Sequence, residues 1–141
     1  MKRIVVDKLI AAFPLYADLK LLALPDGWLK IVNELFCDLR DLQKMMPGYM
    51  PLDPDIQMVA VDWRQYQWPS HVLYVRPAVH HRHWTPEMSA RLVQIVSRFN
   101  EFSHHTCEVC GDQSVGILKY QDSRRQQALC QKHMDERRAA E

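Results

Sequence analysis

The sequence has little net charge, few cysteines and no long apolar run. Its 141 residues carry 18 Lys and Arg against 17 Asp and Glu, for a formal net charge of +1. A chain so balanced lacks the global positive field of many nucleic-acid-binding proteins, so any such function would need a local basic patch. No stretch approaches the roughly 20 apolar residues of a membrane span, and Asp7 and Lys8 interrupt the apolar N-terminal segment that would otherwise resemble an export signal. We therefore expect a cytoplasmic protein that does not enter a membrane.

What remains is the composition of an ordinary globular protein, with 48% hydrophobic and 25% charged residues. The length suits one compact domain or a small domain with an appendage. Four cysteines in a reducing cytoplasm do not form a disulfide scaffold, and closely spaced ones are better interpreted as metal ligands or redox groups. Cys107, Cys110 and Cys130 lie near the C-terminus, whereas Cys37 stands alone.

The clearest helix begins after the break at Pro25-Asp26-Gly27, with Asp26 as its expected cap. Cys37 falls opposite the apolar stripe of this helix, so we interpret it as a bystander rather than a reactive thiol. Weaker patterns predict helical segments over residues 4–12 and 19–24. The stripe of the main helix repeats at helical spacing and comprises Trp28, Ile31, Val32, Leu35, Phe36, Leu39 and Met46.

Two alternating segments, residues 59–64 and 72–75, predict an antiparallel β hairpin. A second long helix should follow, with Thr85 as its N-cap and Pro86 at its first position. Its stripe should pack on the hairpin and on the first long helix. That stripe consists of Met88, Leu92, Ile95, Val96, Phe99 and Phe102. The predicted fold class is α+β, with helices packed on a small antiparallel hairpin or sheet.

The one specific chemical signal is the pattern C-x2-C-x19-C-x2-H formed by Cys107, Cys110, Cys130 and His133. Two thiolates three residues apart bind one ion when the backbone turns sharply between them, and Gly111 permits such a turn. Three thiolates and one imidazole favour Zn²⁺ over Mg²⁺ or Ca²⁺, which prefer oxygen ligands.

A short hairpin over residues 115–120 and 126–129, followed by a polar helix, gives the order of a treble-clef-like zinc finger. We expect a body over residues 1–103 and a zinc-finger module over residues 104–141 packed on it. Four protein ligands leave no open position for water, so the expected zinc is structural. His104 and His105 remain alternatives to His133 as the fourth ligand.

Several other residues are candidates for partner binding. His80, His81 and His83 could bind a metal or phosphate, but the competing interpretation is a solvated loop. Arg124 and Arg125 at the expected hairpin tip could contact a phosphate backbone or an acidic protein, but the competing interpretation is a solvated turn. The module carries equal numbers of basic and acidic residues, so its nonspecific affinity for DNA should be modest. Aromatic residues, which are common at interfaces, gather around the first hairpin and its exit. They are Trp63, Tyr66, Trp68, Tyr74 and Trp84, and core packing is equally consistent with Trp63 and Tyr74.

Four stretches carry a family resemblance across residues 27–133: Gly27-Trp28-Leu29, Leu35-Phe36-Cys37-Asp38-Leu39, Leu73-Tyr74-Val75, and Ser103 through Cys107-Glu108-x-Cys110-Gly111 to Leu129-Cys130-x2-His133. They resemble small uncharacterised zinc-finger proteins of phages and prophages. The glycine-rich basic segment usual in that family is replaced here by residues 65–70. The resemblance implies an origin in a mobile element, the cytoplasm of a bacterial host and the metal site. It implies no biochemical activity.

These observations predict a non-enzymatic, zinc-stabilised binding protein, encoded by a phage, that engages or inhibits a host protein. The prediction depends on the closed metal site, the near-neutral charge and the lack of a catalytic constellation in the sequence. A nucleic-acid-binding regulator that uses the zinc finger is one alternative, and a metal-dependent nuclease or hydrolase is another. No sequence feature indicates the identity of the partner or an oligomeric state.

Overall fold

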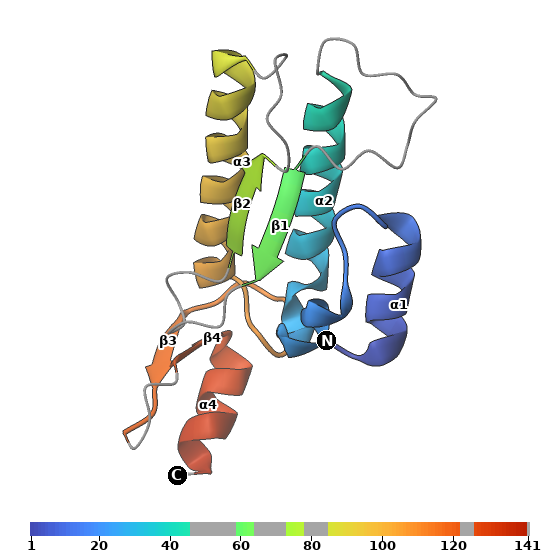
Figure 1. Cartoon of the computed structure of the whole chain (residues 1–141). Coiled ribbons are helices and arrows are strands. Elements are labelled where there is room, and N and C mark those ends of the chain that lie inside the picture. Colours follow the sequence, from blue (N-terminus) through green and yellow to red (C-terminus); the bar gives the residue numbers. More distant parts are fainter. Residues whose placement is uncertain (46–58, 64–72, 78–84, 122–125, 141) are drawn as a thin grey trace.

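Two long helices lie side by side and a β hairpin packs across them, while a smaller unit extends from their lower end (Figure 1). This computed structural model describes residues 1–45, 59–63, 73–77, 85–121 and 126–140, and the fold is that of these residues. The architecture is α+β, as predicted. The elements are α1 (Arg3–Ala12), η1 (Leu19–Ala23), η2 (Asp26–Trp28), α2 (Leu29–Lys44), β1 (Val59–Trp63), β2 (Leu73–Pro77), α3 (Pro86–His105), β3 (Gly116–Lys119), β4 (Gln126–Leu129) and α4 (Gln131–Ala139).

Helix α2 forms because its apolar residues recur on one side, and that side is buried. The buried residues include five of the predicted stripe: Ile31, Val32, Leu35, Phe36 and Leu39. Met46 lies outside the described residues. The expected capping by Asp26 is wrong, because Asp26 begins the short 3₁₀ turn η2 and no side chain caps α2. This extra turn carries Gly27 toward the C-terminal unit.

Strands β1 and β2 pair antiparallel with Val61 opposite Val75, which confirms the predicted hairpin. Trp63 is buried, and its ring lies 6.5 Å from that of Phe36 and 5.6 Å from that of Phe99, measured between ring centres. Such edge-to-face contacts join the hairpin to α2 and α3. Trp63 is therefore a core residue and not part of a binding surface.

Helix α3 begins as the sequence predicts. The hydroxyl of Thr85 accepts a hydrogen bond from the Met88 backbone N–H at 3.2 Å, and Pro86 occupies the first helical position. The predicted stripe is buried over most of its length, at Met88, Leu92, Ile95 and Phe99. Phe102 departs from it, because it is 36% exposed near the end of the helix, where the Arg98 guanidinium lies 5.2 Å from its ring centre.

The C-terminal unit consists of β3, β4 and α4, with β3 and β4 paired antiparallel and Gly116 opposite Leu129. Its buried apolar side chains form a second cluster, separate from the large cluster around α2. Helix α3 continues to His105, so it runs across the predicted boundary at residues 103 and 104. The members of the second cluster are Cys107, Leu118, Leu129, Cys130 and Met134.

Within the described ranges, no helix combines the length and apolarity that a membrane crossing requires.

Candidate metal centre

The first half of the centre is a tight turn that begins directly after α3. The Gly111 N–H donates a hydrogen bond to the Cys107 carbonyl at 2.9 Å, and the Cys107 N–H donates to the Asp112 carbonyl at 2.8 Å. Gly111 has a φ of 83°, a conformation that side chains disfavour, which explains why a glycine follows the second cysteine. The turn, which we call the knuckle (residues 107–111), directs two thiols toward one point.

The second half is formed by the end of β4 and the start of α4. Cys130 immediately precedes α4, its carbonyl accepts the Met134 N–H at 2.9 Å, and His133 lies in the first helical turn. Two hydrogen bonds between Glu108 and Ala128 join this half to the knuckle. The Glu108 N–H donates to the Ala128 carbonyl, and its carboxylate Oε2 accepts the Ala128 N–H, each at 3.0 Å. Strand β4 is thereby held against the knuckle.

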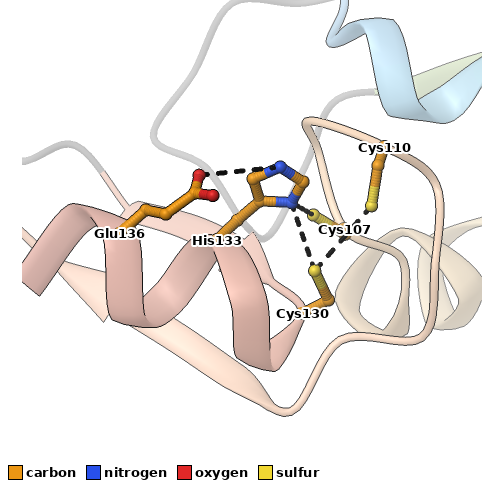
Figure 2. Close-up of polar contacts among 5 residues, drawn as sticks. All are labelled: Cys107, Cys110, Cys130, His133 and Glu136. Carbon is orange, nitrogen blue, oxygen red and sulfur yellow. Dashed lines mark hydrogen bonds and ion pairs between the residues drawn. The ribbon is translucent and has the colours of Figure 1, made fainter.

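The four predicted ligands converge, with their donor atoms all within 4.8 Å of one another (Figure 2). The sulfurs of Cys110 and Cys130 are 3.8 Å apart, and the Nδ1 atom of His133 lies 3.5 Å from the Cys107 sulfur and 3.2 Å from the Cys130 sulfur. A tetrahedral ion with Zn–S bonds of about 2.3 Å separates its sulfurs by about 3.8 Å. The spacing therefore fits a single ion of that size.

The thiols differ in their electrostatic environment. Burial raises the pKa of Cys107, but backbone hydrogen bonds, the first from Cys130, outweigh it and lower that pKa from 9.0 to about 6. Partial loss of hydration, together with the neighbouring thiols, raises the pKa of Cys110 from 9.0 to about 12. A cation bound at the cluster would therefore meet one thiolate already formed and would have to displace the proton of Cys110.

Glu136 lies on the outer side of His133 (Figure 2), with its carboxylate 3.9 Å from the ring Nε2. This distance is too long for a direct hydrogen bond, but a negative charge on that side favours the tautomer with hydrogen on Nε2, which leaves the Nδ1 lone pair facing the sulfurs. The sequence analysis missed Glu136. An acidic residue three positions after a ligand on one helix was the signal that could have found it.

The knuckle packs directly on the backbone of η2. The Gly27 N–H donates a 2.8 Å hydrogen bond to the Glu108 carbonyl. A Cβ atom at Gly27 would lie 2.0 Å from the Cys107 carbonyl oxygen and 2.7 Å from the Gly111 nitrogen, so only glycine permits this approach. In the sequence, Gly27 indicates only a break before the main helix. No local pattern could reveal a contact with residues 80 positions away.

The competing ligands lie elsewhere. His104 has its Nδ1 atom 2.7 Å from the Asn100 carbonyl oxygen, and neither it nor His105 belongs to the group of converging donors. Cys37 is half-buried on α2 with its sulfur 3.8 Å from an Arg40 nitrogen, also apart from the group. The structure thus brings together the predicted set with His133.

The remaining candidate binding residues lie outside the residues that the structure describes, so their predicted roles stay predictions. They are Tyr66, Trp68, His80, His81, His83, Trp84, Arg124 and Arg125. The side chain of Tyr74 is likewise not described, although its backbone pairs with Asp62 in the hairpin.

Chemically, the centre is a group of three cysteines and one histidine that could hold one metal ion with four protein donors. No protein-family model, curated protein or solved structure matches this chain.

Proposed function

We propose that this protein is a non-enzymatic binding protein whose C-terminal unit is stabilised by a structural Zn²⁺ ion at Cys107, Cys110, Cys130 and His133. The observation that carries the proposal is the convergence of these four donors at tetrahedral spacing. Soft sulfur and imidazole ligands select zinc over Mg²⁺ and Ca²⁺. Four protein ligands leave no coordination position for a reacting water, which favours a structural role.

The energetic need for the metal follows from the size of the C-terminal unit. Among its described residues, the buried apolar cluster comprises five, two of which are the ligands Cys107 and Cys130. So small a core contributes little net stability, whereas zinc binding in finger peptides is worth about 10 to 16 kcal/mol. The ion therefore supplies most of the free energy that folds this unit.

Two exposed apolar side chains support a partner-binding surface on the same unit. Val115 and Ile117 are two positions apart, so they lie on one side of the chain at β3, and they are 58% and 36% exposed. Apolar side chains presented together on a folded surface favour protein contacts. The resemblance to phage and prophage zinc-finger proteins supports an origin in a mobile element, and the closed metal site and near-neutral charge favour a host protein as the partner.

The first test is metal content. Protein purified without added metal should contain one equivalent of zinc by elemental analysis, and each of Cys107→Ser, Cys130→Ser and His133→Ala should lower that content. His104→Ala and His105→Ala are matched controls that should keep it. Stoichiometric zinc in the His133→Ala protein but not in a control would show that the fourth ligand is misassigned.

The second test addresses partner binding. The tagged protein should capture a stoichiometric partner from bacterial lysate, and the purified pair should re-form a complex. Replacing Val115 and Ile117 together by Asp should abolish that complex, whereas Val93→Asp, at an exposed valine of α3, should not. Failure to capture a partner, or equal binding by both variants, would contradict this part of the proposal.

A further inference from the structure

The four proposed zinc ligands differ sharply in their access to solvent. Cys107 is 0% exposed and Cys130 is 8% exposed, because both are covered by the small core of the C-terminal unit. Cys110 is exposed at the outer end of the knuckle. A reagent in solution therefore meets one thiolate of the centre before it can reach the others.

An open cleft of about 580 Å³ adjoins that thiol. Leu29, Lys30 and Asn33 line it from α2, and on the other side it is lined by Cys110 and Gly111 of the knuckle and by the next residue, Asp112. A molecule the size of a peroxide occupies on the order of 30 Å³, comparable with water, so it enters without displacing protein atoms. The cleft is the access route to Cys110.

A second sulfur lies directly behind the exposed one. The Cys110 and Cys130 sulfurs are 3.8 Å apart (Figure 2), and a disulfide requires about 2.05 Å. A small side-chain movement can therefore join them once oxidation has loosened the Cys110 sulfur from the ion. An accessible thiolate with a second thiolate at hand is the arrangement found at oxidant-sensitive cysteines.

We propose that Cys110 is an oxidation site, at which a hydroperoxide is reduced and Cys130 then closes a disulfide. This inference rests on the proposed zinc centre, because a bound metal keeps both sulfurs deprotonated. The Cys110 thiolate attacks one peroxide oxygen, the O–O bond breaks, and a sulfenic acid and one hydroxide (or alkoxide) form. The Cys130 thiolate then attacks the Cys110 sulfur, the S–S bond forms, and the sulfenic oxygen leaves as hydroxide.

The two thiolates lose two electrons in total and the peroxide gains them, so no other reactant is needed. The centre is left with Cys107 and His133, two of its four donors, and this pair binds zinc far more weakly. Zinc release would then free the knuckle, including the Glu108 carbonyl that accepts the Gly27 N–H. A thiol reductant plus zinc would restore the starting state.

The test uses the full-length, zinc-loaded protein with hydrogen peroxide. We expect the protein to lose the mass of two hydrogens, peptide mapping to show a Cys110–Cys130 disulfide, and a chromogenic chelator to detect one equivalent of released zinc. Cys37→Ser should respond as the wild type does, because Cys37 is not part of the centre. Cys110→His keeps four possible ligands and should lose zinc to peroxide at least about tenfold more slowly.

A second measurement needs no variant of the centre. Brief treatment of the zinc-loaded Cys37→Ser protein with iodoacetamide should alkylate Cys110 before Cys107 or Cys130. A disulfide that leaves out Cys110, or zinc that survives peroxide with Cys110 unmodified, would overturn this proposal alone. Protein that holds no zinc before peroxide is added would instead contradict the proposed zinc centre.

Discussion

Replacing Gly27 by Ala tests how the metal centre is joined to the helical body. The added Cβ would lie 2.0 Å from the Cys107 carbonyl oxygen, and ordinary contacts begin at 3.4 Å, so the knuckle must retreat by about 1.4 Å. The obstacle is backbone on every side, including the Glu108 carbonyl carbon at 2.8 Å, and cannot swing away as a side chain would. The movement also breaks the 2.8 Å hydrogen bond from the Gly27 N–H to the Glu108 carbonyl.

Loss of a buried hydrogen bond costs about 1 to 3 kcal/mol, and overpacking adds no less than about 1 kcal/mol, so we expect a total cost that starts in the range of about 2 to 4 kcal/mol. Because the C-terminal unit is expected to fold only when zinc binds, this cost should reduce the free energy of zinc binding by the same amount. The dissociation constant should rise by roughly 30- to 700-fold, since 1.4 kcal/mol corresponds to a factor of ten. Competition against a chelator of known affinity measures it.

Gly116→Ala is the matched control, because among the described residues a Cβ there would meet only the Met134 methyl carbon at 3.7 Å, an ordinary contact. We expect its zinc affinity to stay within about threefold of the wild type. The metal-free forms of both variants should unfold in urea at the same midpoint as the metal-free wild type. Equal zinc affinity in the two variants would refute the argument that the knuckle packs on Gly27.

Three further outcomes follow from the same geometry. Removing the metal with a chelator should abolish hydrogen-exchange protection in β3, β4 and α4 while α2 stays protected, because the large apolar cluster around α2 contains none of the ligands; retained protection in α4 would contradict the structural role of zinc. Glu136→Gln should weaken zinc binding by up to about tenfold through loss of the carboxylate beside the His133 Nε2, and Glu101→Gln on α3 should have no effect. Zinc affinity should rise from pH 6 to pH 9, because Cys110, with a pKa of about 12, must give up its proton to bind the ion, and this proton is lost more easily as the pH rises; Cys107, with a pKa of about 6, is already at least half ionised across this range. Calorimetric titrations in buffers of different ionisation enthalpy would measure this proton release, and a pH-independent affinity would contradict it.

The parts of the fold that sequence patterns predicted are those set by local periodicity. The stripe from Ile31 to Leu39 predicted α2, and Thr85 with Pro86 predicted the start of α3, because capping and amphipathicity depend on neighbours within a few positions. The predictions that are wrong concern residues whose conformation or burial depends on tertiary contacts. Asp26 enters a 3₁₀ turn instead of capping α2, and Phe102 is partly exposed although it lies on the apolar stripe.

The same division holds for the metal centre. Ligand identity could be predicted, since two cysteines three residues apart, and later a cysteine and a histidine at the same spacing, can each bind one ion. Choosing His133 over His104 needed the structure, because both residues lie within reach along the chain and only the fold shows which ring faces the sulfurs.

The sequence by itself determined the two long helices, the first hairpin and the three cysteines that can bind a metal, because each follows from residue types at short spacing. Only the tertiary structure decided that the knuckle lies on Gly27, that the His133 ring faces the cysteine sulfurs, and that Cys110 alone of the three cysteines of the centre is exposed. These features join or bury residues according to how separate elements pack. Packing between distant segments leaves no periodic signal in the chain.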